Sequence, residues 1–283
     1  MSQATLAFIG AGNMASAIIA GLVNNDYPAE FILATNRTPG KLHALKEQYG
    51  IRTGSDNLSA AREAQVVVLS VKPQIMREVA SSLRAALSHK PLIISVAAGI
   101  SLEALNHWLG EDLPIVRAMP NTPSQLGVGA CGLYANPHAS AVQKTLAERI
   151  MQAVGTTLWV DKEELIDAVI AVSGSGPAYF FLFMEAMVEA GVKLGLTQQQ
   201  ALDLAGQTAL GAARMVQESG LPPAELRRRV TSPKGTTEQA ILTFEQQGLR
   251  QLTLEAMRAC ATRAKTLAAE LSHIPTSEEE HGK

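Results

Sequence analysis

The stretch 6–15 constrains the fold of this chain more than any other, because an apolar run ends there in two closely spaced glycines. Residues 6–9 are all apolar and predict a buried strand, and the residues after Gly12 predict the start of a helix. In such a unit Gly10 allows the tight turn, Gly12 allows backbone to approach a pyrophosphate, and the small Ala15 allows the helix to lie against the sheet. The stretch therefore predicts a dinucleotide-binding unit, with a purely structural turn as the alternative.

Strand and helix patterns alternate through the first half of the chain. Helical spacing follows the glycine turn at 14–23, and a second amphipathic pattern covers 41–49. Continuous apolar runs predict strands at 31–35, 51–53, 66–71, 92–97 and 115–119. Runs of this kind are typical of parallel strands covered on both faces. Edge strands are expected at 133–134 and 156–160, with a helix at 140–154 between them, so residues 1–160 predict a mostly parallel, Rossmann-like α/β domain.

Only helical periodicity follows Val160. The pattern predicts helices at 162–194, 198–218, 222–230, 236–247 and 250–271, and hence an all-α domain over 161–275. The tail 276–283 carries three consecutive glutamates and is expected to be disordered. The most apolar stretch, 168–192, is interrupted by glycines, a proline and two glutamates, and we expect a buried helix there and no membrane span.

Composition excludes several classes of partner. The chain has 283 residues, 47 % of them hydrophobic, which is ample material for a core. The formal net charge of −2, with mixed signs, argues against nucleic acid or an anionic membrane as partner. Two cysteines and the lack of a leader-like N-terminus predict a reducing, cytoplasmic location. The six histidines have no metal-ligand spacing, so no metal is expected.

The residues after the second predicted strand indicate which dinucleotide binds. Enzymes that select NAD commonly place Asp or Glu there to bind the ribose 2′-hydroxyl, whereas this chain has Asn36, Arg37 and Thr38. A guanidinium suits a 2′-phosphate, so NADP is favoured, with an ordinary solvated arginine as the alternative. Because ligands bind beyond the carboxyl ends of parallel strands, the other strand ends join the predicted site. The predicted cofactor residues are Gly10, Ala11, Gly12, Asn13, Met14, Asn36, Arg37, Thr38, Asn57, Ser70, Val71, Lys72, Pro73, Ala97, Ala98, Met119, Pro120 and Asn121.

The loop 230–237 enters a predicted helix and is the candidate substrate site. Thr236 and Gln239 have the spacing of a capping box, and capping alone is the simpler interpretation. A cap needs one hydroxyl, however, and this loop also contains Ser232 and Thr237 beside the free amides of a helix start, which suit a carboxylate. A second glycine-rich stretch, 173–179, is explained equally well by a helix kink.

Five motifs together resemble the pyrroline-5-carboxylate reductase family in order and spacing, over nearly the whole chain. They are Gly-Ala-Gly-Asn-Met at 10–14, Val-Lys-Pro-Gln at 71–74, Arg-Ala-Met-Pro-Asn-Thr-Pro at 117–123, and the stretches 173–179 and 232–237. The resemblance implies reduction of the cyclic imine L-1-pyrroline-5-carboxylate to L-proline, the last step of proline biosynthesis. It also implies NADPH as the preferred reductant with NADH as a second one, and a homodimer formed by interlocked helical domains that can assemble further.

The resemblance also implies roles for individual residues. Thr237 is expected beside the ring nitrogen as the catalytic residue, and Thr236 at the substrate carboxylate. The predicted substrate-binding set is Glu163, Ser232, Gly235, Thr236 and Thr237. The chain departs from the family at Lys234, where glycine is usual, and at Ala15, where many members have glycine.

Two other functions remain open from the sequence. An NADP-dependent hydroxyacid-type dehydrogenase shares the domain order, but it needs a lysine one helical turn after a glycine pair, where this chain has Phe180. A non-catalytic NADP-binding regulator would not need the hydroxyl-rich loop at 232–237. The short side chains at 205–213 permit close helix packing and favour a dimer.

Overall fold

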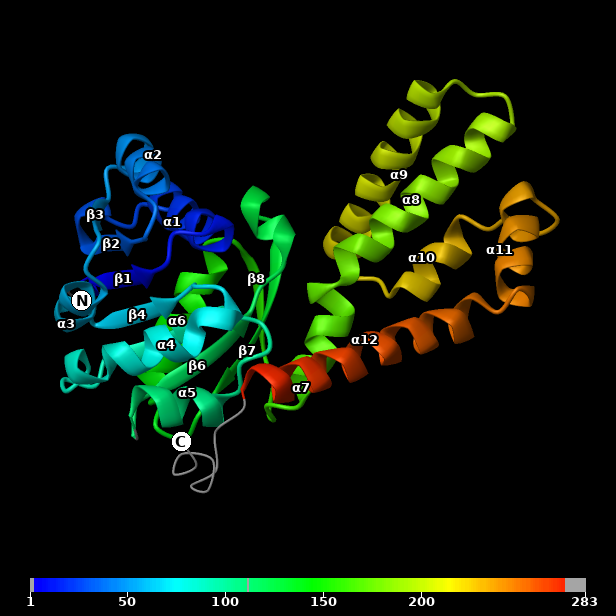
Figure 1. Cartoon of the computed structure of the whole chain (residues 1–283). Coiled ribbons are helices and arrows are strands. Elements are labelled where there is room, and N and C mark those ends of the chain that lie inside the picture. Colours follow the sequence, from blue (N-terminus) through cyan, green and yellow to red (C-terminus); the bar gives the residue numbers. More distant parts are fainter. Residues whose placement is uncertain (1–2, 111, 273–283) are drawn as a thin grey trace. The chain divides into compact units, whose positions relative to one another are not determined.

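The computed structural model describes residues 3–110 and 112–272 (Figure 1). The described chain forms two compact units. One combines the residues up to Ser175 with those from Cys260 onward, and the other is Gly176–Ala259.

The first unit is built on one sheet with the strand order β3-β2-β1-β4-β5-β6-β7-β8. All neighbouring strands are parallel except β6 and β7, which are antiparallel, so the predicted fold class is confirmed. The strands are β1 Leu6–Ile9, β2 Ile32–Thr35, β3 Arg52–Gly54, β4 Val66–Leu69, β5 Leu92–Ser95, β6 Ile115–Met119, β7 Gly129–Ala135 and β8 Gly155–Trp159. The helices between them are α1 Asn13–Asn24, α2 Pro39–Tyr49, α3 Asn57–Glu63, α4 Pro73–Leu83, α5 Leu102–Leu109 and α6 Ala141–Gln152.

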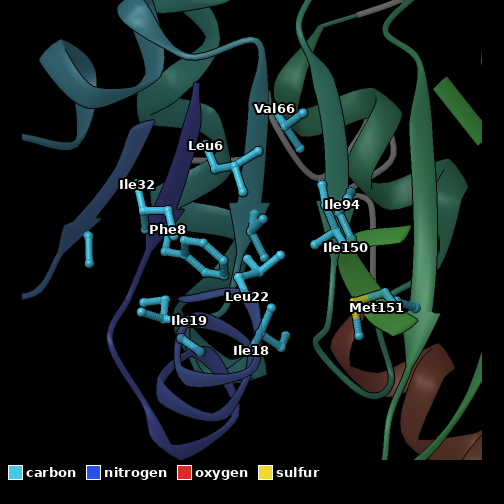
Figure 2. Packing of buried hydrophobic residues seen from close by; sticks show 14 of the residues in the cluster. Leu6, Phe8, Ile18, Ile19, Leu22, Ile32, Val66, Ile94, Ile150 and Met151 are labelled. Atoms are coloured by element: carbon cyan, nitrogen blue, oxygen red, sulfur yellow. The ribbon is translucent and has the colours of Figure 1, made fainter. Parts of the chain in front are cut away.

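Both faces of the central strands are buried, as the continuous apolar runs predict. In β1, Leu6 and Phe8 belong to one hydrophobic cluster, and Ala7 and Ile9 belong to the cluster on the other face. Figure 2 shows the first cluster, in which Phe8 lies near apolar side chains of α1. Because successive side chains of a strand point to opposite faces, β1 is held from both sides and fixes the glycine turn that follows it.

The long helix expected at 162–194 is interrupted. The structure has α7 Leu165–Val169, a π-helix at Ile170–Gly174, and then α8 Gly176–Lys193. The π-helix is contacted by the loop after β6, where Asn121 Nδ2 donates a hydrogen bond of 2.9 Å to the Ser173 carbonyl. The helical pattern at 162–194 is therefore broken beside the glycine-rich stretch 173–179, where the sequence allows a helix kink.

The predicted boundary near residue 160 marks the end of the sheet, and the compact units divide at other positions. Val169 of α7 lies so close to Gly132 of β7 that a Cβ there would stand 2.6 Å from it. The end of α12, Leu249–Leu271, also packs on the first unit, because a Cβ at Gly99 would stand 3.0 Å from Leu271. The Ser101 backbone N–H donates to Ser272 Oγ at 2.9 Å. The predicted tail 276–283 lies outside the described residues.

The second unit is helical. It contains α8, α9 Gln198–Ser219, α10 Pro223–Arg229, α11 Thr236–Gln246 and the part of α12 before Cys260. Helices α8 and α9 run side by side (Figure 1), and Val188, Ala201 and Ala205 form their buried contact. The rings of Phe183 and Phe244 lie 6.0 Å apart.

The apolar segment Leu165–Lys193 is long and apolar enough to cross a membrane by length and composition alone. Only 17 % of its most apolar window is buried inside the chain. Phe180, Phe181 and Leu182 are each about two-thirds exposed. The expected buried helix is therefore mostly exposed within one chain.

Candidate functional site

The glycine turn is held tightly by the end of the neighbouring strand. Gly10 has a φ of +97°, a conformation that side chains rarely adopt. A Cβ on Gly10 would stand 2.9 Å from a Val71 side-chain atom and 3.0 Å from the Ser70 backbone. The Ser70 hydroxyl donates to the Gly10 carbonyl at 2.6 Å. The turn therefore requires glycine here to fold, whether or not a ligand binds.

Gly12, unlike Gly10, has open space around the position of an added side chain. It is the N-cap of α1 and no side chain caps the helix, so the N–H groups of the first turn have no side-chain acceptor. The one described atom near an added Cβ on Gly12 is the Ser70 carbonyl oxygen, at 3.8 Å. An open helix N-terminus of this kind attracts an anion such as a pyrophosphate.

A cavity of about 340 Å³ lies beside this turn and contains most of the predicted cofactor residues. It follows the carboxyl ends of β1, β2 and β4, where a dinucleotide binds in folds of this kind. Its lining includes the predicted residues Gly10, Ala11, Gly12, Asn36, Arg37, Thr38, Asn57, Ser70, Val71 and Lys72, and in addition Lys41, Ser55, Ile75 and Val79.

Two cationic side chains enter this cavity from the start of α2 and the loop before it. Arg37 Nη2 lies 3.0 Å from Glu78 Oε1, and both side chains are exposed. Lys41 Nζ donates to Asn13 Oδ1 at 3.3 Å, beside the first turn of α1. Sequence reasoning missed Lys41, although its place four residues after Arg37, in the first turn of a predicted helix, was a usable signal. With these cations and the open end of α1, the residues present fit a dinucleotide that carries a 2′-phosphate.

The other predicted cofactor residues lie outside the lining of this cavity. Asn13 and Met14 are in the first turn of α1, Pro73 begins α4, Ala97 and Ala98 follow β5, and Met119, Pro120 and Asn121 end or follow β6. Asn13, Met14 and Pro73 directly follow lining residues in the sequence. Strands β5 and β6 come after β4 in the sheet order, so the five residues at their ends belong to a different part of the strand ends. The Asn121 side-chain amide already makes hydrogen bonds within the fold: its N–H group donates to the Ser173 carbonyl, and its oxygen accepts from the Ala130 N–H. Their contact with a cofactor stays a prediction.

Glu163 sits in a network of charged groups in the first unit. Its Oε1 accepts hydrogen bonds of 2.8 Å from the Leu102 backbone N–H and from Arg117 Nη1. The Arg117 side chain is buried, whereas that of Glu163 is a quarter exposed. Burial raises the pKa of the nearby Asp167 carboxyl, and the charges of Arg117 and Lys265 oppose that shift. Glu163 thus joins β6 to the start of α5, and its contact with a substrate stays a prediction.

The candidate substrate loop, residues 230–237, forms a turn that ends at the start of α11. Gly235 is the N-cap and no side chain caps the helix, so the capping box predicted from Thr236 and Gln239 is wrong. The turn is closed by the Gly235 N–H, which donates to the Ser232 carbonyl at 3.0 Å. Glu238 Oε2 accepts a hydrogen bond of 2.7 Å from the Lys234 N–H. Lys234 has a φ of +61°, which explains why glycine suits this position.

Thr236 and Thr237 are the first two residues of α11, and both are exposed. Within the described chain neither hydroxyl makes a hydrogen bond, and no side chain caps the helix. The loop therefore presents two hydroxyls and the N–H groups of a helix end at one place. Such a group of donors can bind a carboxylate and hydrogen-bond to a neighbouring polar atom.

The described residues give no indication of a reactive cysteine at Cys131 or of a metal site. Cys131 is buried, and burial raises the pKa of its thiol to about 12, so it is not a thiolate at neutral pH. In residues 3–110 and 112–272 no three His, Cys, Asp or Glu side chains gather in a way that could hold a metal ion.

Comparison with known proteins gives the family. Residues 163–267 match the model for pyrroline-5-carboxylate reductase dimerisation, and residues 5–99 match that for NADP oxidoreductase coenzyme F420-dependent proteins. The pyrroline-5-carboxylate reductase of Pseudomonas aeruginosa is 50 % identical over 271 residues, which cover 96 % of this chain and 99 % of that protein. The chain belongs to the pyrroline-5-carboxylate reductase family.

Solved structures of the family agree over the full length. The enzyme of Coxiella burnetii has a TM-score of 0.92 at 48 % identity, covering 94 % of this chain and 99 % of that one. That of Plasmodium falciparum, solved with NADP bound, has a TM-score of 0.82 at 29 % identity, covering 95 % and 99 %. The predicted family, fold class and enzyme class are confirmed, and the hydroxyacid dehydrogenase and regulator alternatives are disfavoured. The chain thus combines an NADP-binding type of domain with the dimerisation domain of pyrroline-5-carboxylate reductases.

Proposed function

We propose that this chain reduces L-1-pyrroline-5-carboxylate to L-proline, the last step of proline biosynthesis, and that it uses NADPH in preference to NADH. The observation that carries the proposal is the start of α11, where the hydroxyls of Thr236 and Thr237 are free beside uncapped helix N–H groups. A cyclic imine with an adjacent carboxylate needs hydrogen-bond donors for both the ring nitrogen and the carboxylate.

NADPH, when bound, supplies a hydride to the imine carbon. The cavity at the glycine turn holds the dinucleotide, with the open end of α1 at the pyrophosphate and Arg37 and Lys41 at the 2′-phosphate. No acidic residue follows β2 to bind a 2′-hydroxyl, which favours NADPH. The NADP-bound relative from Plasmodium falciparum supports the same choice.

The substrate loop orients the imine and assists its protonation. Reduction of a C=N bond adds hydride at carbon and a proton at nitrogen, so positioning supplies much of the catalysis. The Thr237 hydroxyl donates a hydrogen bond to the ring nitrogen. Thr236, Ser232 and the N–H groups around Gly235 bind the carboxylate. Glu163 is the remaining member of the proposed substrate set.

An assay of NADPH oxidation tests the function. We expect the purified protein to oxidise NADPH when pyrroline-5-carboxylate is added, with formation of one proline for each NADPH consumed. NADH should be oxidised with a higher KM, because it lacks the 2′-phosphate. Oxidation of NADPH with a 2-oxo acid, and none with pyrroline-5-carboxylate, would favour the hydroxyacid dehydrogenase alternative.

The exposed apolar helices predict a homodimer through the helical domain, and dimers of the family resembled can assemble further. Phe180, Phe181 and Leu182 expose more apolar surface than a monomer tolerates, and they lie inside the matched dimerisation segment. Light scattering on the eluted protein should give at least twice the chain mass of 30.0 kDa. A mass of one chain at micromolar concentration would contradict this. A covered apolar face, balanced charge and two cysteines also favour a cytoplasmic enzyme with no membrane or nucleic-acid partner.

A further inference from the structure

We propose that Glu78 sets how strongly this chain prefers NADPH over NADH, because its carboxylate competes with the 2′-phosphate for Arg37. The inference rests on the proposed use of NADPH. It concerns a residue of α4 that lies 41 positions from Arg37 in the sequence and belongs to none of the predicted motifs.

Glu78 does not itself line the cofactor cavity, but its neighbours do. Arg37 lines that cavity, and so do Ile75 and Val79, which flank Glu78 on α4. Arg37 Nη2 lies 3.0 Å from Glu78 Oε1, so the two side chains form a hydrogen-bonded ion pair. The carboxylate therefore binds the guanidinium that the 2′-phosphate of NADPH would bind.

The ion pair is weak enough to be displaced. The two side chains are 74 % and 71 % exposed, and exposed ion pairs of this kind are strongly screened by water. A phosphate dianion with three acceptor oxygens forms the stronger pair with a guanidinium. Once it is bound, the Glu78 carboxylate lies beside a like charge, and the repulsion lowers the affinity for NADPH.

NADH carries a neutral hydroxyl in place of the 2′-phosphate, so this repulsion does not act on it. The same carboxylate therefore lowers the affinity for NADPH and leaves that for NADH nearly unchanged. Glu78 is thus a specificity-determining residue that moderates the effect of the cations Arg37 and Lys41.

Fluorescence titration of NADPH and NADH against the free enzyme tests this without any turnover. We expect Glu78→Gln to tighten NADPH binding by about three- to fivefold at low salt, and to change the Kd of NADH by less than about twofold. The gain should shrink in high salt, because screening weakens exposed charges. An unchanged NADPH Kd, or an equal change for both cofactors, would overturn the proposal.

Two controls test whether the effect is specific to Glu78 and whether it acts through Arg37. Glu63→Gln removes a carboxylate that is also paired with an arginine, Arg52 at 2.8 Å, but is 40 % exposed and does not line the cavity. It should leave NADPH binding unchanged. In an Arg37→Gln background, Glu78→Gln should have a smaller effect, because the competition for Arg37 is gone and only the direct repulsion between the carboxylate and the 2′-phosphate remains. If the wild-type protein binds NADPH no more tightly than NADH, the proposed cofactor preference fails, whereas the response to Glu78→Gln still decides the role of that carboxylate.

Discussion

Replacing Thr237 with alanine should lower kcat for pyrroline-5-carboxylate about 100-fold, the usual contribution of a positioned proton donor. The hydroxyl is exposed at the start of α11 and forms no hydrogen bond within the described chain, so its removal should cost the fold little. NADPH binding should stay within about twofold of wild type, because the cofactor cavity lies in the other compact unit. Steady-state kinetics and an NADPH titration measure the two effects.

The neighbouring threonine offers a matched control. Thr236→Ala removes an equally exposed hydroxyl one residue earlier, and we expect it to raise the KM for pyrroline-5-carboxylate several-fold with a smaller effect on kcat. Thr237→Ser keeps a hydroxyl and should restore most of the lost turnover. A Thr237→Ala enzyme with unchanged kcat would exclude a role of this hydroxyl in the chemical step.

Most of the fold follows from periodicity, and the exceptions have physical causes. Strands such as β4 are short, uniformly apolar and buried on both faces, so their pattern is unambiguous. Strand β7 begins at Gly129, four residues before the predicted start, because its first residues are mostly small and carry little hydrophobic signal. The π-helix at Ile170–Gly174 depends on a hydrogen bond from Asn121, which a local pattern does not contain.

In the candidate site, too, residues in local motifs were predicted, and those that depend on contacts between distant segments were missed. Glycine turns and strand-end motifs are local, so Gly10, Gly12 and Arg37 were predicted and line one cavity. The capping register at Gly235 was missed because it depends on the turn closed onto Ser232. Glu78 gave no signal at all, since its relation to Arg37 arises only when the fold brings α4 and the loop after β2 within contact of each other's side chains.

Alanine at the two turn glycines should separate folding from cofactor binding. At Gly10 a Cβ would meet the backbone of Ser70 at 3.0 Å and require an unfavourable φ of +97°. We expect Gly10→Ala to lower the free energy of unfolding by about 2–4 kcal/mol, the sum of overpacking and backbone strain. Thermal or urea unfolding of the protein without cofactor measures this loss.

At Gly12 the backbone is extended, with φ −76°, and an added Cβ meets no described atom closer than 3.8 Å. Stability of the cofactor-free protein should therefore stay within about 1 kcal/mol of wild type, the range of N-cap substitutions. The methyl group would instead occupy the space beside the open end of α1, so the Kd for NADPH should rise at least about tenfold through lost phosphate contacts. If Gly12→Ala unfolds the protein while binding NADPH normally when folded, then Gly12 serves the turn and not the pyrophosphate. Because Gly10→Ala and Gly12→Ala place the same methyl group two residues apart, opposite outcomes would identify which side of the turn faces the cofactor.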